Sequence, residues 1–114
     1  MNTKELRIGN LFREKESEQI IEVIELSKDQ ITFTGKFPYK WQAEPIETNE
    51  EDLLKLGFEN GVDEMTYCGK DFCVYWRKFE GHFEINGEKY FKEYIHELQN
   101  LLFALYGTEL SYEY

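Results

Sequence analysis

The sequence predicts an α+β fold with an N-terminal curled antiparallel sheet, open or closed into a small barrel, and a short helix. An antiparallel β-meander follows, with a C-terminal helix packed on one face. Three observations predict this class. Short β-branched and aromatic runs alternate with turn residues in both halves of the chain. An Asn-Gly dipeptide joins two of the runs. An amphipathic segment that ends at a glycine follows them.

The 114 residues are enough for one domain with a buried core. We expect a single domain over residues 1–114, built from four consecutive segments. These are N-terminal strands (1–44), a short helix (45–58), a β-meander (64–92) and a C-terminal helix (93–107).

The N-terminal segment reads as three strands, with a fourth left open. Residues 6–13 contain a Gly-Asn turn and a first strand, and residues 14–18 form a charged connection. The β-branched runs 19–26 and 31–34 predict a hairpin. A further strand at 40–43 is bracketed by two prolines, which interrupt regular pairing.

The short helix has clear start and stop signals. Thr48 and Asn49 are both good caps, and three carboxylates follow at the positive end of the helix dipole. Gly57 predicts the end of the helix. We expect its buried side to consist of Leu53, Leu54 and Leu56.

Four strands are predicted in the meander, at 65–68, 72–78, 82–85 and 88–91. Asn86-Gly87 predicts a two-residue type I′ turn, because both positions of that turn need positive φ. Such a turn fixes the pairing of the flanking strands. The expected pairs are Ile85 with Glu88, Glu84 with Lys89, and Phe83 with Tyr90.

The C-terminal helix is predicted from about residue 93 to 106, ended by Gly107. Residues 111–114 are expected to form a frayed tail. The predicted buried stripe follows helical spacing and consists of Ile95, Leu98, Leu101, Leu102 and Leu105.

Three segments resemble an uncharacterised family of small proteins from Bacteroidetes genomes and their phages. They are ELRIGNLF (residues 5–12), PIETNEEDLLKLGF (45–58) and YIHELQNLLFALYGTEL (94–110). In the middle segment, Asn49 stands at the family's cap position, and Asp52 and Leu56 replace aromatic residues. The family has no assigned activity, cofactor or catalytic residue, so the resemblance implies none here.

The chain carries a net charge of −10, with 13 basic and 23 acidic residues spread along its length. Such a charge repels nucleic-acid phosphates and anionic lipid surfaces. No apolar run approaches the roughly 18 residues of a membrane span, and no signal peptide is visible. We therefore expect a cytoplasmic protein with no membrane association, and nucleic acid is a disfavoured partner.

His96, Gln99 and Asn100 share one helix face beside the apolar stripe. They are candidates for a recognition patch, or for hydrogen bonds to strand ends at the edge of the core. The only other histidine is His82, and the spacings typical of zinc sites are missing from the sequence. We expect no metal site and no cofactor.

Two cysteines, Cys68 and Cys73, are too few for a disulfide framework. If Lys70-Asp71 forms a two-residue loop, the cysteines face each other across a hairpin. The favoured interpretation is two packed free thiols, and a disulfide or redox pair is the alternative.

Phe37, Tyr39 and Trp41 alternate in a segment with Lys36 and Lys40. Aromatic residues interleaved with lysines can stack single-stranded bases. They can equally pack across the sheet or contact a protein, so these three residues complete the candidate interaction residues.

No catalytic motif is recognised in the sequence, so no residue is assigned a catalytic role. The favoured function is a non-catalytic accessory or protein-interaction module of a bacterial mobile element or phage. One alternative is a nucleic-acid-associated module that uses residues 37–41, and another is a small enzyme with a dispersed site. The sequence names no partner and leaves open whether the protein forms a homo-oligomer.

Overall fold

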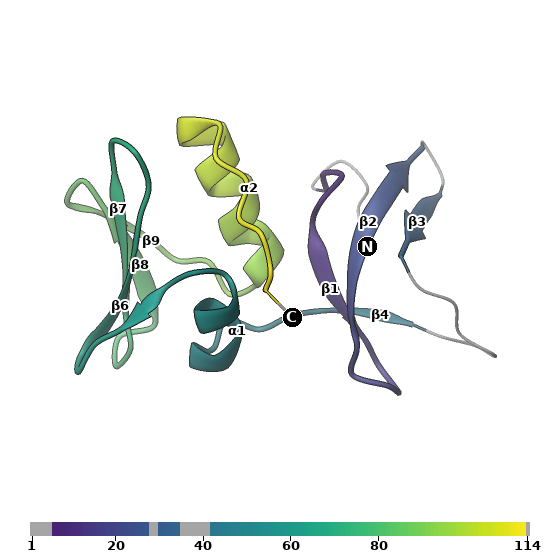
Figure 1. Ribbon diagram of the computed structural model, residues 1–114, viewed down its shortest axis with the longest axis horizontal. Coiled ribbons are helices and arrows are strands. Elements are labelled where there is room, and N and C mark those ends of the chain that lie inside the picture. The colour runs from purple at the N-terminus through teal and green to yellow at the C-terminus, as the bar shows by residue number, and fades with distance from the viewer. Residues whose placement is uncertain (1–5, 28–29, 35–41, 114) are drawn as a thin grey trace. The chain divides into compact units, whose positions relative to one another are not determined.

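The computed structural model describes residues 6–27, 30–34 and 42–113. The chain divides into two compact units. The N-terminal unit combines Met1–Glu47 with Tyr94–Glu109, and the meander unit combines Thr48–Glu93 with Leu110–Tyr114. The described residues form two antiparallel sheets and two helices (Figure 1), which confirms the predicted α+β class.

A curled four-stranded sheet forms most of the N-terminal unit, with strand order β3-β2-β1-β4. A register shift between Val23 and Glu25 interrupts the pairing of β2 with β3, and such irregularities increase local twist. Phe12, Ile21 and Val23 are almost fully buried in its core. The strands are β1 (Leu11–Glu14), β2 (Ile20–Leu26), β3 (Ile31–Phe33) and β4 (Ala43–Pro45).

Glu14 is a buried carboxylate, 2% exposed, at the end of β1. Its oxygens accept hydrogen bonds from the backbone N–H groups of Glu16, Ser17 and Gln42, at 2.9–3.2 Å. These bonds, the one from Ser17 foremost, lower the pKa of Glu14 from 4.5 to about 2. The sequence predicted only a charged connection here. The carboxylate instead organises the turn that follows β1.

The C-terminal helix α2 (Ile95–Tyr106) ends at Gly107, which adopts the predicted left-handed conformation with φ 66°. Of the predicted stripe, Ile95, Leu98 and Leu102 are fully buried, while Leu101 is half-buried and Leu105 is 45% exposed. The helix belongs to the N-terminal unit and contacts β1.

The meander unit holds a five-stranded antiparallel sheet of order β5-β6-β7-β8-β9. Its four longest strands match the predicted ones, and β5 was not predicted. The strands are β5 (Glu59–Asn60), β6 (Glu64–Cys68), β7 (Cys73–Arg77), β8 (His82–Ile85) and β9 (Glu88–Tyr90).

The β8–β9 hairpin confirms the predicted turn and register. Asn86 and Gly87 have φ of 52° and 81°, as a type I′ turn requires. The three expected strand pairs are all present. Because the loop has only two residues, the turn determines which residues of β8 and β9 lie opposite each other.

The short helix α1 (Glu50–Lys55) is capped by Asn49, whose side-chain oxygen accepts the Asp52 N–H at 2.9 Å. Thr48 instead donates its hydroxyl to the Lys92 carbonyl oxygen at 3.2 Å. Gly57 ends the helix with φ 99°. Leu54 was predicted to be buried, but it is 47% exposed. It lies on the solvent-facing side of this helix, which buries only one face.

Two further expectations are corrected in the meander unit. Cys68 and Cys73 form a disulfide, so the favoured interpretation as free thiols is wrong. The tail is also held: Tyr112 donates its hydroxyl to Asp52 at 2.9 Å, and the Glu113 N–H donates to the Lys55 carbonyl oxygen at 2.7 Å. No described helix is long and apolar enough to cross a membrane.

Candidate functional site

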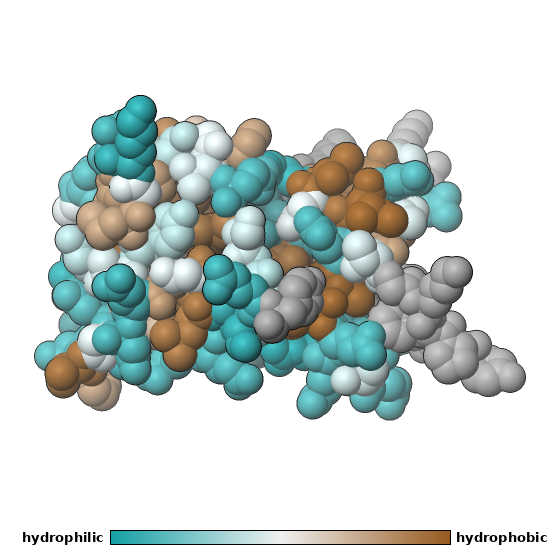
Figure 2. Space-filling view, in the orientation of Figure 1, coloured by the Kyte–Doolittle hydropathy of each residue, from teal (hydrophilic) through white to brown (hydrophobic). Residues whose placement is uncertain are grey.

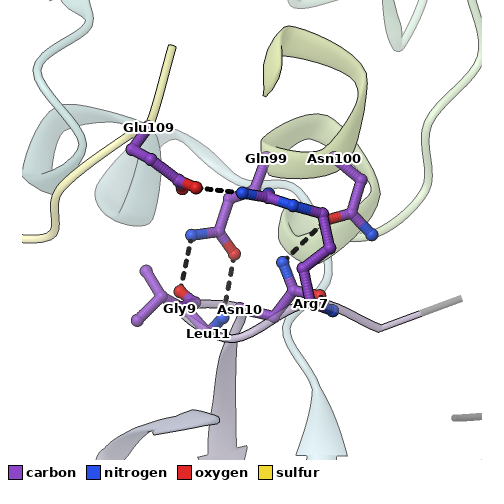
Figure 3. Close-up of polar contacts among 7 residues, drawn as sticks. All are labelled: Arg7, Gly9, Asn10, Leu11, Gln99, Asn100 and Glu109. Atoms are coloured by element: carbon purple, nitrogen blue, oxygen red, sulfur yellow. Dashed lines mark hydrogen bonds and ion pairs between the residues drawn. The ribbon is translucent and has the colours of Figure 1, made fainter. Parts of the chain in front are cut away.

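Gln99, one of the candidate residues, is fully buried and joins α2 to the turn before β1 (Figure 3). Its side-chain oxygen accepts the Leu11 N–H at 2.8 Å, and its side-chain nitrogen donates to the Gly9 carbonyl oxygen at 3.1 Å. One side-chain amide thus hydrogen-bonds two backbone groups at the start of β1. This is the hydrogen bonding to a strand end that the sequence offered as one interpretation.

Asn100 extends the same network. Its side-chain oxygen accepts from the Asn10 amide at 2.8 Å and from the Arg7 guanidinium at 3.3 Å. Arg7 also pairs with Glu109 and lies 3.7 Å from the centre of the Phe103 ring. These contacts lie within the N-terminal unit, so they position α2 on its own sheet.

His96 is 9% exposed, and its ring stacks between two aromatic side chains. The ring centres of Phe12 and Tyr94 lie 4.9 and 5.8 Å away. The remaining candidates, Phe37, Tyr39 and Trp41, lie outside the described residues.

Exposed apolar side chains gather at one end of the meander unit. Val62, Phe79 and Phe91 are 89, 85 and 74% exposed, more than any other large apolar residue among those described. In Figure 2, apolar surface lies at the lower left, where Figure 1 places the turns that join β5 to β6 and β7 to β8. Large apolar surface left in water is typical of interaction sites.

Strand pairing brings these residues to the same end. The Lys78 N–H donates to the Asp63 carbonyl oxygen at 3.1 Å, so the turn carrying Val62 lies beside the turn carrying Phe79. Phe91 follows β9, and its ring lies 5.5 Å from the His82 ring at the start of β8. We call this surface the meander end; its apolar members are Val62, Phe79 and Phe91.

A pocket of about 430 Å³ opens at the meander end. Its lining combines one aromatic ring with three carboxylates and two cations: Asp63, Arg77, Phe79, Glu80, Glu84 and Lys89. Arg77 binds Glu84 at 2.9 Å and also pairs with Glu64. The lining and Glu64 together carry four carboxylates against two cations, so the pocket favours a positively charged ligand group.

The ion pairs hold the pocket in its charged form. The Arg77 hydrogen bond, supported by a contact of 3.1 Å from His82, lowers the pKa of Glu84 from 4.5 to about 2. The same hydrogen bond raises the pKa of Arg77. Both side chains therefore stay ionised throughout the physiological pH range.

Glu80, His82 and Glu84 place their donor atoms within 4.8 Å of one another. A divalent cation could be held by such a set. However, Glu84 already binds the Arg77 guanidinium at 2.9 Å, so one of the three ligands is committed to an ion pair. The expectation of no metal site stays a prediction.

Sequence reasoning did not single out the residues of the meander end. A signal was present: Phe79 stands in the short turn between two predicted strands, where a large apolar residue has no sheet neighbour to pack on. Arg77 and Glu84 alternate with buried residues along β7 and β8. Their pairing across strands became visible only with the β7–β8 register.

No family model, curated protein or solved structure matches the chain.

Proposed function

We propose that this protein is a non-catalytic interaction module that binds a basic segment of another protein at the meander end. The exposed apolar trio beside a carboxylate-rich pocket is the observation that supports this proposal. The family resemblance adds the proposal that the module belongs to a phage or mobile element.

Apolar contact supplies the affinity in this proposal. Burial of one fully exposed phenylalanine side chain is worth about 1.5–3 kcal/mol. Phe79 and Phe91 together could therefore contribute about 3–6 kcal/mol before the costs of association are subtracted. A micromolar complex needs a net binding free energy of about 8 kcal/mol, so charge pairing and further apolar contacts must add to the burial of these two rings.

Charge selects the partner. The meander end carries an excess of carboxylates, and the whole chain carries −10. A second copy of this chain would bring the same negative charge to the interface, so a different, basic partner fits better. The partner segment would place a lysine or arginine in the pocket and apolar side chains against Phe79 and Phe91.

A selection from a displayed library of random peptides tests the proposal. We expect enrichment of peptides that combine lysine or arginine with large apolar residues. Binding of a selected synthetic peptide should weaken at least tenfold in Phe79→Ser and in Glu80→Gln. Leu54→Ser, an exposed apolar position on α1, is the matched control and should leave affinity unchanged.

Three outcomes would overturn the proposal: enrichment of acidic peptides, no enrichment at all, or equal losses in Phe79→Ser and the Leu54→Ser control. A concentration-dependent dimer that Phe79→Ser abolishes would instead assign the surface to a second copy of the chain, and would also overturn it.

A further inference from the structure

The disulfide of the meander unit lies away from the pocket, at the opposite end of the β6–β7 hairpin from the Glu64–Arg77 pair. Cys68 is the last residue of β6 and Cys73 the first of β7. They stand directly opposite each other, with Cα atoms 4.0 Å apart. Cys68 is exposed and Cys73 half-buried, so a solvent-borne thiol can approach the bond from the Cys68 side.

The hairpin is held without this bond. Five directly opposed residue pairs join the two strands. Met65, Val74 and Trp76 bury its inner face. The Gly69 N–H donates to the Phe72 carbonyl oxygen at 2.8 Å and closes the loop. The strands therefore keep the two sulfur atoms opposite each other when the disulfide opens.

The covalent link encloses a short segment, with a sequence separation of 5. A cross-link constrains the unfolded chain less when its loop is short. The chain contains no third cysteine, so an opened pair can only close on itself or on an external thiol. An exposed disulfide that closes a short loop is better suited to thiol–disulfide exchange than to stabilising the fold.

We propose that Cys68 and Cys73 form a reversible thiol–disulfide exchange site whose substrates are dithiols. A thiolate of the dithiol attacks the Cys68 sulfur, forming a mixed disulfide and releasing the Cys73 thiolate, which takes up a proton. The second thiol of the dithiol, as its thiolate, then attacks the donor's own sulfur in the mixed disulfide and releases the Cys68 thiolate, which is also protonated. The dithiol becomes a disulfide, and two electrons and two protons pass to the cysteine pair.

The test is reduction of the folded protein by millimolar dithiothreitol, followed by alkylation and mass spectrometry. We expect the native protein to be reduced at a rate within about tenfold of that of the urea-unfolded protein. Its far-UV circular dichroism should stay unchanged, and removal of the reductant in the presence of oxidised dithiothreitol should restore the bond. Reduction that requires unfolding, or loss of strand signal on reduction, would overturn the proposal.

A control disulfide can be placed in the same hairpin. Thr66 and Tyr75 are directly opposite, two residues further from the loop and half-buried. Thr66→Cys with Tyr75→Cys, in a Cys68→Ser and Cys73→Ser background, should be reduced at least tenfold more slowly because the sulfur atoms are less accessible. Equal rates in the two proteins would show that the native position has no special exposure and would contradict the proposal. If the quadruple variant does not fold, the comparison of native and unfolded wild-type protein still decides the question.

Discussion

Gln99→Glu changes one buried amide group to a carboxyl group of the same shape. The oxygen that accepts the Leu11 N–H is retained, but the nitrogen that donates to the Gly9 carbonyl becomes an oxygen about 3.1 Å from another acceptor. The new carboxylate would be fully buried, and burial disfavours its charged form. We therefore expect the variant to unfold more easily at neutral pH.

The magnitude follows from proton linkage. An unfolded glutamate has a pKa of about 4.3, and burial beside a carbonyl oxygen raises the pKa in the folded variant. The protonated carboxyl can donate to Gly9 as the amide does, so the penalty is small below about pH 4. Above about pH 4, the loss of unfolding free energy grows by about 1.4 kcal/mol per pH unit until the pH reaches the pKa of the folded variant. A folded pKa near 7 gives a loss of about 3–4 kcal/mol at pH 7.

The assay is urea denaturation followed by far-UV circular dichroism at pH 4 and pH 7. Ala104→Glu is the control, because it adds the same charge at an exposed position of the same helix. The difference in unfolding free energy between the two variants removes the general effects of pH and added charge. Equal stability of the two variants at pH 7, or a difference that does not narrow at pH 4, would refute the role assigned to Gln99.

Four other outcomes are expected. Gly87→Val should cost well over 1 kcal/mol in urea denaturation, because a β-branched residue resists the φ of 81° at that position; an unchanged midpoint would contradict the turn. The stability contributed by the Glu14 carboxylate, whose pKa is about 2 against 4.5, is complete above pH 4.5 and is lost as the pH falls through about 2. Glu14→Gln should therefore lower the free energy of unfolding at pH 7, and the difference from the wild-type protein should shrink as the pH falls towards 2. A difference in unfolding free energy that is the same at every pH would contradict the role of the Glu14 carboxylate. A chelator should leave the melting temperature unchanged; one equivalent of bound zinc would instead assign Glu80, His82 and Glu84 as ligands. Oligonucleotides should bind weakly or undetectably at physiological salt, and submicromolar binding abolished by Trp41→Ala would favour the nucleic-acid alternative.

Local patterns determined the elements whose conformation depends on a few neighbouring residues. The Asn86-Gly87 turn fixed the β8–β9 pairing because only residues that tolerate positive φ fit it. Gly57 and Gly107 ended their helices for the same reason. The alternation and spacing of apolar residues identified most strands and the fully buried part of α2.

The tertiary structure decided what depends on residues far apart in the chain. Gln99 could be placed on a helix face from spacing, but its partners at Gly9 and Leu11 lie about ninety positions earlier. Glu14 looked like an ordinary loop charge until three backbone N–H groups converged on it. Likewise, strand pairing brought Val62, Phe79 and Phe91 to one end of the meander. Hydrogen-bond partners and surface neighbours are set by how the strands pair, and no short-range pattern encodes that pairing.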